Sequence, residues 1–151
     1  MKDLDAFNAG LLEFLCASPT PFHAVQALAM ALAGRGFVEL DEAEPWNLQP
    51  SGRYLLRRNG SSLIAFVKGR RPAVESGLRL VGAHTDSPCL KPKPRPELRR
   101  HGYLQLGVEV YGGALLNPWF DRELSLAGRL SFGTAVGVAH ALIDFRSPSV
   151  T

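Results

Sequence analysis

The chain has 151 residues, of which 46% are hydrophobic and 21% are charged, a composition typical of one globular domain. No apolar run approaches the roughly 18 residues that a membrane-spanning helix needs, so we expect no membrane partner. Only two cysteines occur, Cys16 and Cys89, which is too few for a disulfide framework. The N-terminus carries Asp3 and Asp5 where a secretory signal would carry basic residues. These features predict free thiols and a cytoplasmic location.

The net charge of +3 conceals a local basic excess. Residues 51–100 hold twelve Lys and Arg against three Asp and Glu, and residues 91–100 are the densest part. Such a block attracts phosphate or acidic ligands through its field. Its alternating prolines instead favour a solvated, extended connector, because they are unfavourable in both helices and sheets. No aromatic residue stands among these bases to stack on nucleobases, so we expect no nucleic-acid partner.

Two helices are predicted near the N-terminus. Apolar residues spaced by three and four indicate an amphipathic helix over residues 5–15. A second helix begins with Thr20 as N-cap and Pro21 in the first helical position. Gly34 and Gly36 end it.

Strands dominate the remainder of the chain. Asn59-Gly60 is a strong hairpin signal between the predicted strands at residues 53–58 and 62–68. The residue pattern changes at the basic block (residues 91–100), and no helical periodicity follows it. The pattern predicts an α/β portion and then a β-rich portion, with strands at residues 53–58, 62–68, 78–83, 104–111, 124–132 and 138–145.

His84 and Asp86 follow the predicted strand at residues 78–83, at the end where open α/β sheets place their ligands. Side chains two residues apart in an extended segment share a face, so the Asp86 carboxylate can reach the imidazole of His84. A carboxylate on one ring nitrogen leaves the other free to bind a metal ion. Two other interpretations of His84 and Asp86 stay open: they lie in a solvent-exposed turn, or they are the His–Asp pair of a hydrolase triad.

Four longer motifs resemble the aspartyl aminopeptidase family, in the family's order and spacing. They are SPTPFHAV (residues 18–25), GAHTDSPCLK (82–91), VEVYGG (108–113) and WFDRELSLAGR (119–129). The resemblance extends over nearly the whole chain, to about residue 145.

The resemblance implies an α/β metallopeptidase domain interrupted by an inserted β-rich domain. Residues 1–92 would be the N-terminal portion of the catalytic domain, and residues 93–151 the beginning of the inserted lid or dimerisation domain. It further implies two metal ions, usually zinc with manganese or cobalt as alternatives, that act on peptides with acidic (Asp or Glu) N-terminal residues. His84 matches a metal ligand, and Asp86 matches the catalytic acid that orients it. Family members assemble as homo-oligomers.

The family's other metal ligands and its catalytic glutamate do not occur in this sequence. We therefore expect an incomplete piece of a metallo-aminopeptidase that is inactive alone, since stable zinc sites need three or four protein ligands. The alternative is a non-catalytic remnant that serves as an oligomerisation or interaction module.

Other polar residues have structural interpretations. His23 is expected to cap or pack at its helix terminus. His101 and His140 are expected on the surface or in strands, and Cys89 as a buried thiol. Residues 121–123 (Asp-Arg-Glu) are expected to hold a turn or a subunit contact.

Overall fold

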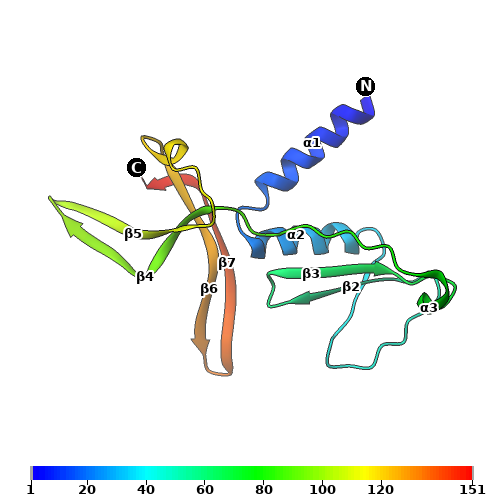
Figure 1. The fold of residues 1–151 in the computed structure, drawn as a ribbon. Coiled ribbons are helices and arrows are strands. Elements are labelled where there is room, and N and C mark those ends of the chain that lie inside the picture. The colour runs from blue at the N-terminus through cyan, green and yellow to red at the C-terminus, as the bar shows by residue number, and fades with distance from the viewer. Residues whose placement is uncertain (1, 151) are drawn as a thin grey trace. The chain divides into compact units, whose positions relative to one another are not determined.

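A computed structural model describes the backbone of residues 2–150 and the side chains of residues 3–146. The chain divides into two compact units. The first unit comprises residues 1–85 and 127–144, and the second comprises residues 86–126 and 145–151. The predicted division into a catalytic portion (1–92) and an inserted portion (93–151) stays a prediction. The mixed α/β class is confirmed (Figure 1).

The first unit begins with helices α1 (Lys2–Cys16) and α2 (Pro21–Ala33), as the spacing predicted. The Thr20 side chain caps α2 by accepting a hydrogen bond from the His23 backbone N–H at 3.4 Å. After α2 the chain turns at Gly36, whose φ of +81° suits a residue without a Cβ. Helix α2 packs on strands β2 and β3.

A three-stranded sheet accompanies α2, in the order β1 (Val38–Glu39), β2 (Arg53–Arg58) and β3 (Ser62–Val67). Strands β2 and β3 form the predicted hairpin, and both turn residues have positive φ (51° at Asn59 and 65° at Gly60). Two positive φ values match the twist of the strands and hold this register.

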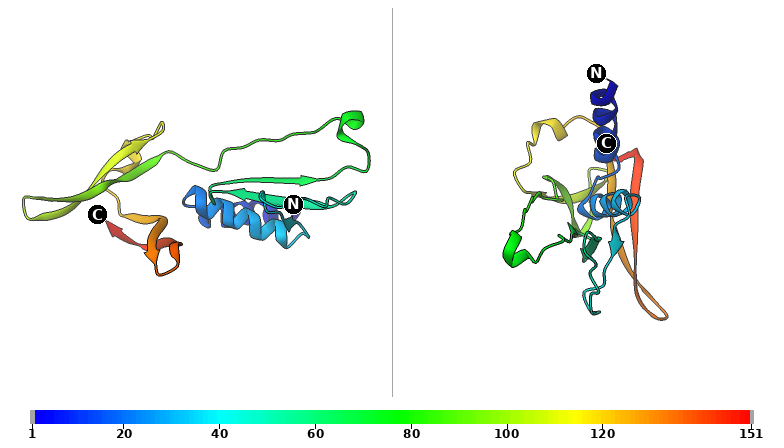
Figure 2. Two further views of the ribbon diagram at one scale, coloured as in Figure 1. Left: turned by 90° about the horizontal axis from the view of Figure 1, so that it is seen from below. Right: turned by 90° about the vertical axis from the view of Figure 1, so that its right-hand side faces the viewer.

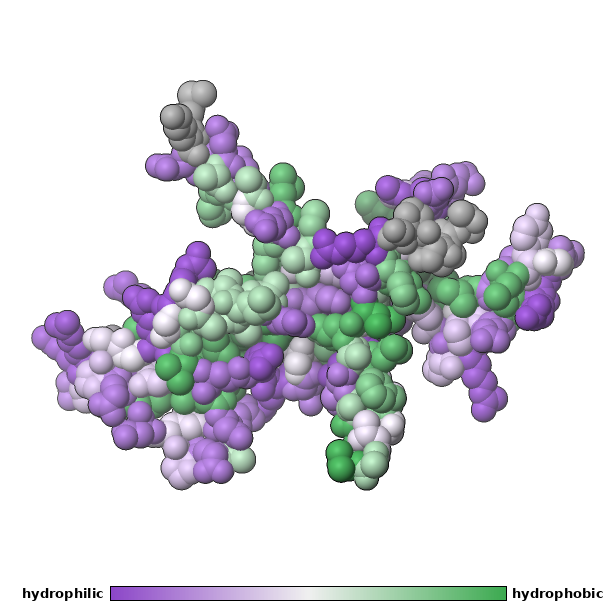
Figure 3. All heavy atoms as spheres, turned by 180° about the vertical axis from the view of Figure 1, so that it is seen from behind, coloured by the Kyte–Doolittle hydropathy of each residue, from purple (hydrophilic) through white to green (hydrophobic). Residues whose placement is uncertain are grey.

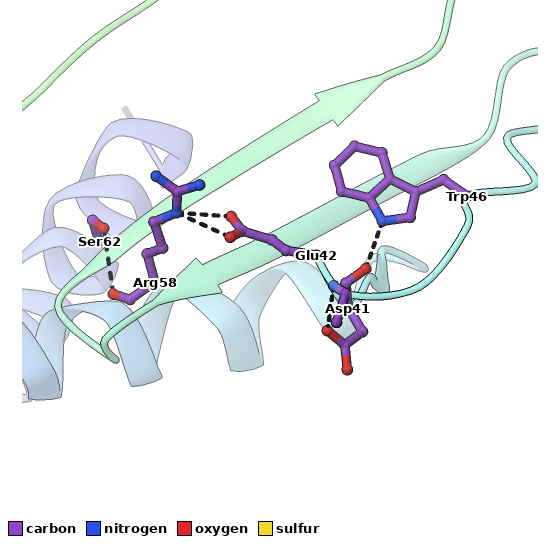
Figure 4. Close-up of polar contacts among 6 residues, drawn as sticks. Asp41, Glu42, Trp46, Arg58 and Ser62 are labelled. Atoms are coloured by element: carbon purple, nitrogen blue, oxygen red, sulfur yellow. Dashed lines mark hydrogen bonds and ion pairs between the residues drawn. The ribbon is translucent and has the colours of Figure 1, made fainter.

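The core of the described residues lies between α2 and β2. Its buried side chains are Ala24, Val25, Ala29, Tyr54, Leu55 and Leu56, of which Val25 and Leu55 are fully buried. An aromatic cluster extends this core, since the Tyr54 ring centroid lies 5.5 Å from that of Phe66, which lies 6.4 Å from Trp46. The loop carrying Trp46 is held by polar contacts (Figure 4): the indole N–H donates to the Asp41 carbonyl, and Arg58 pairs with Glu42 at 3.0 Å.

The predicted strand at residues 78–83 is wrong. After a short helix, α3 (Ala73–Ser76), these residues run as an extended segment without a ladder partner in the described part of the chain (Figure 2). Leu80 is 87% exposed and Val81 is fully exposed. An apolar run of this kind becomes a strand only beside a neighbouring strand, because a single extended segment leaves its backbone groups unpaired.

The second unit holds an antiparallel pair, β4 (Cys89–Arg100) and β5 (Tyr103–Tyr111). The expectation that residues 91–100 would be a connector outside any sheet is therefore wrong. A register shift between Pro92 and Glu97 takes two of the three prolines out of the ladder. Each strand of a two-stranded sheet also has an unpaired edge, where a proline costs no hydrogen bond.

Strands β6 (Leu124–Thr134) and β7 (Gly137–Val150) pair with each other, and a 3₁₀ turn, η1 (Asn117–Trp119), precedes them. The predicted strands at 104–111, 124–132 and 138–145 are confirmed. Within residues 2–150, no helix combines the length and apolar character needed to cross a bilayer. Residues of high hydropathy, drawn green in Figure 3, lie at the surface in several places. Phe7 and Ile64 are among the large hydrophobic residues that are exposed.

Candidate functional site

His84 lies near the end of the extended segment that follows α3, and its side chain is exposed. The next residue, Thr85, is half-buried, and its hydroxyl donates to the Ser61 carbonyl at 2.8 Å. Ser61 follows the β2–β3 turn. This hydrogen bond connects the residue after His84 to the hairpin of the first unit, whereas no strand pairing within residues 2–150 does so.

Asp86 begins the second unit and is half-buried there. The Tyr111 hydroxyl donates to Asp86 Oδ2 at 2.7 Å. This hydrogen bond, together with the negative charge of the carboxylate, raises the pKa of Tyr111 above its ordinary value of 10.0. The Lys91 ammonium lies 5.7 Å from the centroid of the same ring. Tyr111 therefore holds one oxygen of the carboxylate.

Tyr111 is a functional candidate that sequence reasoning missed. It is the last residue of β5 and lies opposite Cys89, the first residue of β4, three positions after Asp86. Counting back from the turn at His101 and Gly102 would place Tyr111 opposite Pro92. The register shift between Pro92 and Glu97 places it opposite Cys89 instead, so no local sequence signal indicated this contact.

A zinc centre needs more donors than this region provides. Within the described residues, no group of three or more His, Cys, Asp or Glu side chains is placed to hold a metal ion. Protein zinc sites use three or four such donors. These residues do not form a metal centre by themselves, and the roles predicted for His84 as ligand and Asp86 as its orienting acid stay predictions.

The structural interpretations of other polar residues can be compared with the structure. The N-cap of α2 is Thr20, and His23 Nδ1 lies 2.7 Å from its hydroxyl oxygen, so His23 packs against the capping residue at the helix terminus. Both cysteines are free thiols, but Cys89 is half-buried and not buried as expected, because β4 has only one neighbouring strand. Arg122 donates to the Pro118 carbonyl at 3.2 Å, which is a turn contact.

His101 and His140 are both exposed, as expected. His101 lies in the β4–β5 turn with a φ of +52°, and His140 lies on β7. Neither is close to a set of metal-binding side chains in the described part of the chain.

The sequence model of the M18 peptidases, described as "Aminopeptidase I zinc metalloprotease (M18)", matches residues 14–150. The chain therefore belongs to the M18 family, in agreement with the resemblance of its motifs. A relative from Azotobacter vinelandii, named "Probable M18 family aminopeptidase 2", is 64% identical over 141 residues. That alignment covers 93% of this chain and 33% of the relative.

Solved structures agree with this assignment. The structure of Chaetomium thermophilum mApe1 matches with a TM-score of 0.87 at 34% identity, over 95% of this chain and 33% of that one. The S. cerevisiae mApe1 dodecamer matches with a TM-score of 0.86 at 29% identity, over 97% of this chain and 35% of that one. The chain thus spans about a third of the length of the relatives that it matches.

Proposed function

We propose that these residues are the N-terminal part of a metallo-aminopeptidase that removes acidic (Asp or Glu) N-terminal residues from peptides at a two-metal centre, with zinc as the metal. The observation that carries the proposal is the match of residues 14–150 to a family of zinc metalloproteases. The name of the Azotobacter vinelandii relative, a probable aminopeptidase, supports the reaction class.

In this proposal His84 supplies one nitrogen donor, and Asp86 holds its imidazole in the required orientation. Tyr111 donates to Asp86 Oδ2 and so fixes the position of the carboxylate. The remaining donors and the catalytic base come from sequence outside these 151 residues, because the described residues contain no complete donor set.

A chimaeric enzyme tests the proposal. Residues of this chain replace the matching 141-residue segment of the Azotobacter vinelandii relative, and hydrolysis of aspartyl and glutamyl peptides is measured with bound metal per subunit. We expect metal-dependent hydrolysis. His84→Asn should remove activity and lower the metal content, whereas the matched control His101→Asn, at an exposed turn, should change neither.

Asp86→Asn keeps the shape of the side chain but loses its charge. Changes to the residues that orient a metal-bound histidine commonly cost about 10- to 100-fold in metal affinity or activity. Excess metal should partly rescue this variant and should not rescue His84→Asn. Unchanged metal content in the chimaera carrying His84→Asn would remove the assignment of His84 as a ligand.

The 151-residue chain alone should hydrolyse neither aspartyl nor glutamyl peptides, even with zinc, manganese or cobalt added. Loss of one member of a catalytic unit commonly costs several orders of magnitude in rate, and here several members are outside the chain. Metal-dependent turnover by the purified chain would contradict the proposal.

We further propose self-association of the complete protein and a cytoplasmic location. The S. cerevisiae mApe1 structure is named a dodecamer, which supports the first. The two free thiols support a reducing compartment. Light scattering of the chimaera and fractionation of cells that express it test these two points separately.

A further inference from the structure

A pocket of about 420 Å³ lies within the first unit, between α2, the β2–β3 turn and the β6–β7 pair. Its apolar lining comes from Phe22, Val25 and Leu142. Basic side chains, Arg57, Arg129 and His140, line it as well. A volume of this size lies within the range of small-molecule sites, and the mixture of apolar wall and few polar groups is typical of them.

Arg129 is held firmly, but by neutral partners. Its guanidinium carbon lies 4.0 Å from the centroid of the Phe22 ring, and one terminal nitrogen donates to the Asn59 carbonyl at 2.6 Å. A guanidinium group has five N–H donors, so this single hydrogen bond leaves others for a ligand. Stacking on the ring also fixes the plane of the group, which reduces the entropy lost on binding.

The charge balance of the pocket favours an anion. No Asp or Glu is among the described residues that line it. The two other basic side chains differ in their partners. Arg57 is paired with the acidic Glu39 at 2.7 Å and contributes little net charge. His140 has a neutral partner, since its Nδ1 lies 2.8 Å from the Ser131 hydroxyl oxygen. The neighbouring hollow beside β1 differs in this respect, because Glu39, Asp41 and Glu42 line it together with its two arginines.

We propose that the Arg129 pocket binds a small organic oxyanion. Its carboxylate or phosphate group pairs with the remaining N–H donors of Arg129, and its apolar part lies against Phe22 and Leu142. A planar guanidinium suits either group, since both accept two parallel N–H hydrogen bonds. The site requires none of the predicted metal-site residues, so it is independent of the proposed peptidase activity.

Titration calorimetry of the 151-residue chain at low ionic strength tests this site, because salt screens exposed charge pairs. The probes are glutarate, phenyl phosphate and inorganic phosphate. We expect saturable binding of at least one organic anion with a Kd below about 10 mM, tighter than for inorganic phosphate because the apolar wall contributes. Tighter binding of glutarate assigns a carboxylate ligand, and tighter binding of phenyl phosphate assigns a phosphate ligand.

Arg129→Gln should weaken this binding about tenfold or more, the loss expected for a hydrogen bond to a charged group. Arg122→Gln is the matched control, because Arg122 also donates to a backbone carbonyl but lies in the second unit. Equal weakening by both variants, no change in either, or no saturable binding to the unmodified chain would overturn the proposal.

Arg129 also links β6 to the β2–β3 turn, so its replacement can disturb the fold. Arg129→Lys and His140→Gln keep the test decisive where circular dichroism shows that Arg129→Gln unfolds. Lys preserves the charge without the planar fork, so we expect weaker binding of the organic anion, and His140→Gln should weaken it less. The amide signal of Gly60, which lines the pocket, should shift on titration; an unshifted Gly60 signal would place the anion elsewhere and overturn the proposal.

Discussion

The two strands of the β2–β3 hairpin and the segment at residues 78–83 are all predicted as strands from the sequence, yet only the hairpin forms a ladder among the described residues. In the hairpin, Leu55 is 2% exposed and each strand has a partner. In the segment, Val81 is fully exposed, and no ladder forms within the described residues. The hairpin obtains its neighbour through a two-residue turn, whereas the segment needs a strand distant in sequence. Local signals therefore suffice for the first and not for the second.

The largest effect on the free energy of unfolding is expected in the buried β2–β3 hairpin. Leu55→Ala removes a side chain packed in the core beneath α2 and should lower the free energy of unfolding by about 2–5 kcal/mol. Denaturant unfolding followed by circular dichroism measures it. A loss below about 1 kcal/mol would show that the hairpin core contributes much less than its burial indicates.

A smaller loss is expected at the cap of α2. Thr20→Ala removes the oxygen that accepts from the His23 backbone N–H and contacts its ring, and should cost about 1 kcal/mol. Thr20→Ser retains the oxygen and is the control. Equal destabilisation by Ala and Ser would attribute the effect to the lost methyl group and not to the cap.

Asp86 offers a test in the second unit through the titration of Tyr111. Because the neutral hydroxyl donates to the carboxylate, the folded-state pKa of Tyr111 lies above its unfolded value. The contact therefore stabilises the fold at pH values below the ordinary tyrosine pKa, and this contribution is lost as pH rises through the higher folded pKa.

Asp86→Asn should move the Tyr111 pKa back toward its ordinary value, as measured by absorbance of the phenolate. Tyr103→Phe removes a background signal from an exposed tyrosine and serves as the reference protein. An unchanged Tyr111 titration in Asp86→Asn would show that the hydroxyl does not bond this carboxylate in solution.

Sequence reasoning predicted the elements whose causes are local. Thr20 and Pro21 begin α2 where expected, and Asn59-Gly60 sets the hairpin turn. It failed where a neighbouring strand decides the outcome. Residues 78–83 have no partner strand in the described part of the chain, whereas the proline-containing residues 91–100 pair with β5. The same limit applies to the site. His84 and Asp86 were predicted from the motif, and their roles stay predictions. Tyr111 lies 25 residues after Asp86 and contacts it through the β4–β5 register.

The smallest effect on the free energy of unfolding is expected in the exposed segment at residues 78–83. Val81→Ala removes two methyl groups that contact little in this chain, so unfolding should change by no more than about 0.5 kcal/mol. In the chimaera with the Azotobacter vinelandii relative, the additional sequence can supply a neighbouring strand. If residues 78–83 then become a buried parallel strand, the same substitution should cost about 1 kcal/mol or more, since it deletes buried apolar groups. Thermal unfolding of both proteins, each beside its Val81→Ala variant, gives the difference. Equal and negligible losses in both would mean that this apolar run stays exposed even in the longer chain, and that its resemblance to a strand has no structural consequence.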